Sequence, residues 1–194
     1  MQLLGGETAE HFRQREYDLA GFCTGIVEES QIVDGRLIKP GDKVIGIESS
    51  GLHSNGYSLI NDMLWRHKIS WADTPELLTP TTIYAPLVKH LLNEVPILGM
   101  AHITGGGIAG NLSRILPEDC SAVIDKKLLP TLPVFPFLKT RGELSESEMF
   151  DTFNMGVGLV IVVSPDTSKF ILNRFKQVKK IGEIKENQIG VVIK

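Results

Sequence analysis

The stretch Ser49-Ser50-Gly51-Leu52-His53-Ser54-Asn55-Gly56-Tyr57-Ser58 joins two apolar segments through two glycines and five small polar side chains. Residues 43–48 before it are short, apolar and β-branched, which predicts a buried strand. Apolar residues recur at helical spacing after it, and Ser54 or Asn55 is expected to cap that helix. Such a loop presents backbone N–H groups beside a helix N-terminus, so it is either an anion cradle or a glycine-rich turn that only reverses the chain.

A second glycine-rich loop, Thr104-Gly105-Gly106-Gly107, follows the apolar residues 97–103. Consecutive glycines cost backbone entropy when they become ordered, and close approach of a ligand to the backbone would account for that cost. The residues alone leave two interpretations open, a second anion cradle and a purely structural turn.

The first forty residues carry three further signals. Gly5-Gly6-Glu7-Thr8-Ala9-Glu10 pairs two carboxylates with two glycines, so this loop either holds magnesium or turns the chain. Residues 17–28 are mostly apolar and predict a long central strand. Asp34-Gly35 between apolar residues predicts a β-hairpin. The abrupt start at Met1 predicts that the chain is a fragment.

The rest of the chain alternates helical and extended patterns without an internal repeat. These patterns predict an α+β fold with α/β-like layers, in which helices pack against one mixed β-sheet, and a single domain over residues 1–194. Helices are expected at residues 57–67, 87–92, 146–153, where Ser145 opens a capping box, and 165–175. Further strands are expected at residues 121–124, 159–163, 180–184 and 189–193.

Composition narrows the classes of function. The net charge is −3 and no long lysine or arginine block is present, so no nucleic-acid partner is predicted. No apolar run approaches about 20 residues and no signal peptide begins the chain, which predicts a cytoplasmic protein without a membrane partner. Cys23 and Cys120 have no metal-ligand spacing, and we expect buried thiols rather than a disulfide.

Two of the five histidines lie beside the glycine-rich loops. His53 and His102 are each expected either to bind a phosphate or transfer a proton, or to pack structurally. The sequence contains no H-E-x-x-H, G-x-x-x-x-G-K-[ST] or Ser/His/Asp motif, which disfavours a zinc protease, a P-loop enzyme and a hydrolase triad.

Five ordered motifs together resemble one enzyme family over essentially the whole chain: residues 5–10, 17–22, 49–58, 101–107 and 152–158. The family is phosphoribosylformylglycinamidine cyclo-ligase, the aminoimidazole ribonucleotide synthetase of purine biosynthesis. The resemblance covers its C-terminal part, a little over half of a full enzyme. It implies an ATP-dependent closure of the imidazole ring of formylglycinamidine ribonucleotide, with ADP and phosphate released.

The resemblance also implies ligands, partners and residue roles. ATP and magnesium are the expected cofactors, with catalytic roles for His53 and Glu7 and a metal-linked role for Glu10. The full-length enzyme is expected to be a homodimer in which an N-terminal domain closes the cleft, so this chain alone is expected to be inactive. Substrate and phosphate contacts are assigned to Ser50, Gly51, Ser54, Asn55, Gly56, Thr104, Gly105, Gly106, Gly107 and Asn154.

The chain departs from the family pattern in three places. The N-terminal domain with its Asp-Gly-Val-Gly-Thr-Lys motif is absent, and residues 11–15 replace a Met-Pro-Gly-Met-Tyr-like loop. Thr82 stands where the family commonly has arginine, which removes a bidentate donor to phosphate or carboxylate. Two alternatives therefore remain: a non-catalytic binding domain of the same fold, and another ATP-dependent kinase or synthetase of the superfamily, such as thiamine monophosphate kinase, selenophosphate synthetase or a hydrogenase-maturation protein.

Overall fold

The computed structural model describes residues 21–72, 74–186 and 190–194. The chain divides into two compact units, residues 1–32 and 33–194. In the described part of the first unit, η1 (Glu29–Gln31) is a short 3-10 helix. The strand predicted over residues 17–28 is wrong for residues 21–28, which form no strand because none of the described strands pairs with them. Its first four residues lie outside the described ranges.

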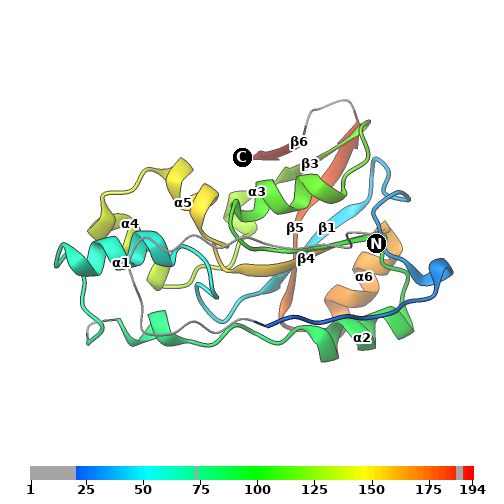
Figure 1. Cartoon of the computed structure of the whole chain (residues 1–194). Helices are drawn as coiled ribbons and strands as arrows, with labels where there is room; N and C mark the ends of the chain where they lie inside the picture. Colours follow the sequence, from blue (N-terminus) through cyan, green and yellow to red (C-terminus); the bar gives the residue numbers. More distant parts are fainter. Residues whose placement is uncertain (1–20, 73, 187–189) are drawn as a thin grey trace, which may run out of the picture. The chain divides into compact units, whose positions relative to one another are not determined.

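The second unit is built on a six-stranded sheet in the order β2-β4-β1-β5-β3-β6 (Figure 1). Every neighbouring pair is antiparallel except β3 and β6, which are parallel, so the predicted mixed sheet is confirmed. The strands are β1 (Lys43–Glu48), β2 (Gly99–His102), β3 (Cys120–Ile124), β4 (Val157–Val163), β5 (Val178–Glu186) and β6 (Gly190–Ile193).

Strand β4 is the most buried element of the sheet, since all seven of its residues are buried. Its side chains alternate between two apolar clusters, with Val160 in one and Ile161 in the other. This alternation follows from the two-residue period of a strand. The prediction of a strand covered on both faces is therefore confirmed.

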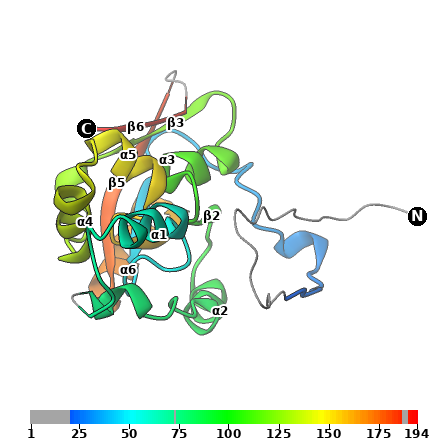
Figure 2. The same ribbon diagram turned by 60° about the vertical axis from the view of Figure 1, so that its left-hand side comes forward.

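Helices cover both faces of the sheet. Helix α3 (Gly107–Leu112) packs its apolar residues against one face. Helices α2 (Ala85–Glu94) and α6 (Pro165–Arg174) pack against the other face (Figures 1 and 2). The short 3-10 helices η2 (Pro75–Leu78), η3 (Ser113–Ile115) and η4 (Lys126–Leu128) lie in the connections. Within the described ranges, no helix has the length and apolar content that crossing a membrane requires.

Three helices form a third apolar cluster: α1 (Tyr57–Trp65), α4 (Val134–Gly142) and α5 (Glu146–Thr152). The predicted capping box of α5 is confirmed, since Ser145 and Glu148 exchange hydrogen bonds. Helix α4 was not predicted, because three prolines between residues 130 and 136 obscure its apolar spacing. One of them, Pro133, is the N-cap residue, where the missing N–H costs nothing.

Three local predictions are wrong. Asp34-Gly35 makes a turn but no hairpin, because the residues on either side pack into different clusters, Val33 with one face of the sheet and Ile38 with the other. Neither Ser54 nor Asn55 caps α1; the N-cap is Gly56 in the left-handed conformation, without a side-chain cap. Both cysteines are free as expected, but only Cys120 is buried and Cys23 is exposed.

Candidate functional site

The two glycine-rich loops leave the sheet at the same edge. Strands β1 and β2 flank β4, and each pairs with it antiparallel, so β1 and β2 run in the same direction. Their last residues, Glu48 and His102, lie opposite Val157 and Leu159 at the start of β4. The loop that enters α1, the loop that enters α3 and the turn that enters β4 therefore meet at one place (Figure 1).

The loops also approach each other through their side chains. A Cβ atom built on Gly105 would lie 3.7 Å from Oδ1 of Asn55. The rings of His53 and His102 have centroids 6.4 Å apart. Residues of the first and second glycine-rich loops therefore lie close together.

Asn154 joins the turn before β4 to the loop after β1. Its Oδ1 accepts from the hydroxyl of Ser49 at 3.1 Å and from the N–H of Gly156 at 2.8 Å. Its Nδ2 donates to the carbonyl of Gly51 at 2.8 Å. The side chain is 1% exposed, and both its amide oxygen and its amide nitrogen bond the protein.

His53 is a buried histidine in the left-handed backbone conformation, with φ of 59° and 3% exposure. Its Nε2 accepts from the N–H of Ser50 at 3.2 Å and from the N–H of Thr82 at 3.5 Å. Since Nε2 accepts, this hydrogen-bond pattern assigns the proton of the neutral ring to Nδ1. Nδ1 is buried and has no hydrogen-bond partner among the described residues.

The surroundings of His53 favour the neutral ring. Burial, followed by the charge of His102, lowers the pKa of the His53 imidazole below its usual 6.5. His102 lies exposed at the end of β2. The arrangement supplies a fixed N–H donor next to a second histidine that solvent can reach.

Tyr84 and Gly158 complete the surroundings of His53, and sequence analysis missed both. The Tyr84 hydroxyl donates to the carbonyl of Glu48 at 2.8 Å, and burial raises its pKa to about 12, so the phenol stays neutral. A Cβ atom on Gly158 would lie 2.0 Å from Oη of Tyr84 and 2.4 Å from Cε1 of His53. Only glycine leaves room for the two rings here.

A cavity of about 390 Å³ lies beside the first loop, between it and residues 77–81. The hydroxyl of Ser50 donates to the carbonyl of Pro80 at 2.7 Å, and the hydroxyls of Ser54 and Thr81 are 3.1 Å apart. The cavity lining consists of His53, Ser54, Tyr57, Leu77, Leu78, Thr79, Pro80 and Thr81. His53, Ser54 and Tyr57 of the first loop therefore face a space that can hold a ligand.

The surroundings of the two glycines of the first loop show what each of them packs against. A Cβ atom on Gly51 would make ordinary contact with Thr79 at 3.6 Å. At Gly56, with φ of +81°, a Cβ atom would lie 2.3 Å from the ring of Phe153. Gly56 thus allows the start of α1 to pack directly on the α5 segment.

Part of the backbone of the second loop is hydrogen-bonded within the protein. The N–H of Gly106 donates to the carbonyl of Asp151 at 3.1 Å, and the N–H of Gly107 donates to the carbonyl of Thr104 at 3.1 Å. Asn111 Nδ2 bonds the carbonyls of this loop, and its Oδ1 accepts from the Thr104 hydroxyl at 3.1 Å. Two of the amides expected to face an anion are therefore already hydrogen-bonded within the protein.

Close packing accounts for the last glycine of this loop. Gly107 has φ of +60°, and a Cβ atom there would lie 1.8 Å from the carbonyl oxygen of Phe150. The glycine lets α3 rest against α5. The structural interpretation therefore explains Gly106 and Gly107, while the N–H of Gly105 makes no backbone hydrogen bond of this kind to another described residue.

Glu7, predicted to be catalytic, and Glu10, predicted to bind metal, lie outside the described residues. Among the residues that are described, no group of three or more histidine, cysteine, aspartate or glutamate side chains forms a metal site. The described part of the chain by itself therefore does not offer the several oxygen ligands that magnesium needs.

The mixed sheet with helices on both faces defines the class of this unit as an α+β domain, and solved structures show the same fold. The hydrogenase maturation protein HypE of E. coli has a TM-score of 0.58 at 20% identity over 82% of this chain and 48% of its own. PurL of T. maritima, complexed with AMPPCP, has a TM-score of 0.52 at 14% identity over 82% of this chain and 24% of its own.

The chain belongs to the AIR synthase related protein family, because the model of that family's C-terminal domain matches residues 39–194. This confirms the resemblance found in the sequence. The phosphoribosylformylglycinamidine cyclo-ligase of Geobacillus thermodenitrificans is 49% identical over 179 residues, 86% of this chain and 52% of the relative. That of Clostridium tetani is 44% identical over 202 residues, 99% of this chain and 61% of the relative. The chain thus spans 52–61% of the length of these relatives.

Proposed function

We propose that this chain is the C-terminal domain of a cytoplasmic phosphoribosylformylglycinamidine cyclo-ligase of de novo purine biosynthesis. The identity of 49% to the G. thermodenitrificans relative supports this, and so does the order of the five motifs. The observation that carries the proposal is the meeting of the His53 loop, the Gly105 loop and the Asn154 turn at one sheet edge.

The proposed reaction closes an imidazole ring. The γ-phosphoryl group of ATP passes to the formyl amide oxygen of formylglycinamidine ribonucleotide, which releases ADP and activates that carbon. The amidine nitrogen then attacks the carbon, and phosphate leaves as the ring forms. Such a reaction requires fixed hydrogen-bond donors at the phosphoryl oxygens.

The first loop supplies groups of the required type. We assign the proton-handling role to His53, whose Nδ1 side is the free side of the ring, because two backbone amides occupy Nε2. Polar contacts to substrate are assigned to Ser50, Ser54 and Asn55. Gly51, beside the cavity residue Thr79, and Gly56 are assigned to substrate as well, although the close contact at Gly56 is with Phe153.

The second loop is assigned to a substrate phosphate, through Thr104, Gly105, Gly106 and Gly107. Since the amides of Gly106 and Gly107 bond within the protein and the Thr104 hydroxyl donates to Asn111, the N–H of Gly105 is the better placed contact. Asn154 is also assigned to substrate. Its effect is indirect, because its amide bonds the carbonyl of Gly51 and so positions the first loop.

ATP and magnesium belong to the proposal as the resemblance implies them. The T. maritima PurL structure was solved with AMPPCP, and HypE has been solved in complex with ATP, which supports ATP as a substrate here. Glu7 and Glu10 are the carboxylates assigned to catalysis and to the metal. The described residues alone form no metal site.

The partners proposed are an N-terminal domain and a second copy of the full-length protein. The relatives are longer than this chain, which spans 52% of the first of them. We propose that the remaining half of such a protein closes the sheet edge and that the homodimer is the active form. The 194-residue chain alone is then expected to be inactive.

The test is reconstitution. The chain is fused to the N-terminal half of the G. thermodenitrificans relative, and phosphate release is measured with ATP, magnesium and formylglycinamidine ribonucleotide. Release that requires both substrates supports the proposal, and a His53→Asn variant should lose it. A folded, dimeric hybrid without any turnover would contradict the proposal.

A non-catalytic binding domain is the second candidate, and the internal bonds of Gly106 and Gly107 favour it. Turnover by the hybrid separates this candidate from the cyclo-ligase, and a thermal-shift screen of the chain with aminoimidazole ribonucleotide and thiamine monophosphate separates the cyclo-ligase from a related kinase. Stabilisation by the former supports the cyclo-ligase. Stabilisation by thiamine monophosphate alone supports the related kinase, whose A. aeolicus structure has a TM-score of 0.55 at 18% identity.

A further inference from the structure

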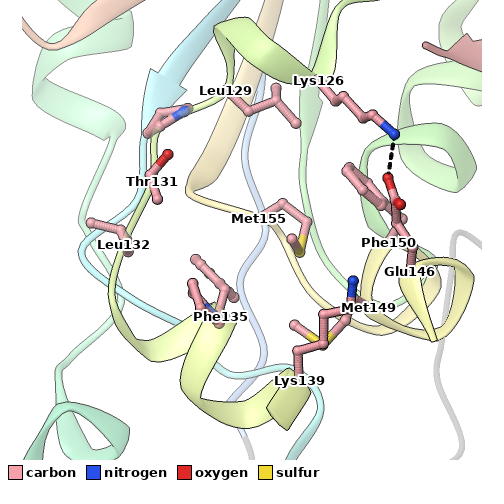
Figure 3. Close-up of a pocket in the computed structure, with 12 residues that line it drawn as sticks. Lys126, Leu129, Thr131, Leu132, Phe135, Lys139, Glu146, Met149, Phe150 and Met155 are labelled. Carbon is pink, nitrogen blue, oxygen red and sulfur yellow. Dashed lines mark hydrogen bonds and ion pairs between the residues drawn. The ribbon is translucent and has the colours of Figure 1, made fainter. Parts of the chain in front are cut away.

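A second cavity lies on the far side of α5 from the glycine-rich loops. Its volume is about 210 Å³, and none of the described residues of the predicted site lines it. The walls come from η4, the segment that follows it, α4, α5 and Met155 (Figure 3). The lining residues are Lys126, Leu129, Pro130, Thr131, Leu132, Phe135, Pro136, Lys139, Glu146, Met149, Phe150 and Met155.

The walls combine thioethers with aromatic rings. Met149 is fully buried and Phe135 is 3% exposed, so both are fixed parts of the apolar cluster. Phe150 and Met155 are partly buried and face the cavity. Methionine sulfur and phenylalanine rings both make favourable contacts with an aromatic ring.

Met155 is held in the cavity by an uncommon backbone conformation. Its φ is 49°, and Gly156 after it has φ of 89°. Residues other than glycine rarely adopt positive φ, and those that do are enriched at functional sites. Figure 3 shows the Met155 side chain between Phe135 and the Lys126–Glu146 pair, so this conformation puts the thioether in the middle of the cavity.

The rim of the cavity has an excess of positive charge. Lys126 pairs with Glu146 at 2.5 Å, and the bond and charge of Lys126, followed by the charge of Lys139, lower the pKa of Glu146. Glu146 is therefore ionised and paired. Lys139 forms no ion pair within the described part of the chain. Two lysines and one glutamate leave a net charge of +1 at the rim.

We propose that this cavity binds a small aromatic anion, with its ring between Met149, Met155 and Phe135 and its anionic group at Lys139. The volume is below the roughly 300–1,000 Å³ of drug-sized pockets, which limits the ligand to one or two rings. The apolar walls contact the aromatic ring, and Lys139 pairs with the anionic group of the ligand. This site is independent of the proposed cyclo-ligase activity.

The test uses the 194-residue chain with ¹³C-methyl methionine and three probes of one ring size: benzoate, benzamide and cyclohexanecarboxylate. Benzoate should shift the methyl signals of Met149 and Met155 and leave those of Met63 and Met100 unchanged. Benzamide and cyclohexanecarboxylate should bind more weakly, because one lacks the charge and the other lacks the aromatic ring. Benzoate shifts confined to Met63 or Met100, or equal binding of all three probes, overturn the proposal.

Three variants locate the contacts. Lys139→Met should weaken benzoate binding at least about threefold, as loss of one charge-assisted contact predicts, and leave benzamide binding unchanged. Lys127→Met is the matched control, because Lys127 does not line the cavity. Met155→Gly is compatible with the positive φ, and it should reduce binding of benzoate and benzamide alike. If Lys127→Met weakens benzoate binding as much as Lys139→Met does, the assignment of Lys139 is wrong.

Discussion

The backbone N–H of Ser50 donates to Nε2 of His53 at 3.2 Å, within the same loop. A proton on Nε2 would abolish this bond, so the loop conformation and the protonation of the imidazole depend on each other. The free side of His53 is Nδ1, which has no hydrogen-bond partner among the described residues.

The first prediction concerns the tautomer of His53. Because Nε2 accepts from Ser50 and Thr82, neutral His53 should carry its proton on Nδ1. Long-range ¹H–¹⁵N NMR spectra of the imidazoles at pH 7.5 distinguish the two nitrogens. Exposed His67 serves as the reference. A protonated Nε2 in His53 would show that the loop bonds are not formed.

The second prediction is a pH dependence of stability. The pKa of His53 lies below 6.5 in the folded protein, so the unfolded chain binds the proton more readily and acid favours unfolding. This contribution is present above pH 6.5 and is lost as the pH falls from 6.5 toward the folded pKa. The free energy of unfolding, measured with urea, should decrease from pH 7.5 to 5.5.

In His53→Asn the free energy of unfolding should fall less between pH 7.5 and 5.5, because the variant removes the titrating group. Asparagine also tolerates the positive φ of this position. The control is His67→Asn, since His67 is exposed and also has positive φ. It should follow the wild-type protein. A His53→Asn curve as steep as the wild-type curve would assign the pH dependence to other groups.

The third prediction concerns the close approach at Gly158. Gly158→Ala should cost about 1–3 kcal/mol of stability, the usual range for overpacking, because the new Cβ meets Tyr84 and His53. In a Tyr84→Phe background the cost should be smaller, since the nearest atom, Oη, is gone. Thermal or urea unfolding of the four proteins gives the coupling. The control is Gly110→Ala, where a Cβ has open space and should not destabilise the fold. If Gly158→Ala costs the same free energy of unfolding in both backgrounds, the Tyr84 contact is excluded.

The fourth prediction concerns Asn154. Asn154→Ala should cost at least about 2 kcal/mol, because it leaves the carbonyl of Gly51 and the N–H of Gly156 buried without their partner. The matched control is Asn173→Ala on the exposed side of α6, which should change stability by less than about 0.5 kcal/mol. Equal effects of the two substitutions, measured by urea unfolding, would show that the amide does not hold the loop.

Sequence patterns predicted the elements whose formation depends on residues close together in the chain. The run at residues 159–163 and the capping box at Ser145 were both recognised, and both are present. Residues 21–28 were misinterpreted because a strand exists only with a hydrogen-bonded neighbour, which a single sequence does not show. The Asp34-Gly35 turn was recognised, but its flanking residues pack into different clusters, which depends on tertiary structure.

The sequence predicted the site residues that lie together in one loop, and it missed those that reach the site from a distant segment of the chain. His53 and both glycine-rich loops were recognised from composition and spacing. Tyr84 was missed, because its bond to the carbonyl of Glu48 joins residues 36 positions apart. The internal bond of Gly106 was equally hidden, since its acceptor, the carbonyl of Asp151, belongs to a distant helix.

The pairing of both loop-bearing strands with β4 makes this domain more sensitive to insertions than to substitutions. A one-residue insertion within β4 would displace its start by about 3.3 Å relative to both neighbours and turn its side chains to the opposite faces. Backbone hydrogen bonds, rather than side chains, therefore maintain the spacing of the two loops. Substitutions within the loops should leave that spacing intact, provided that the length of this one strand is unchanged.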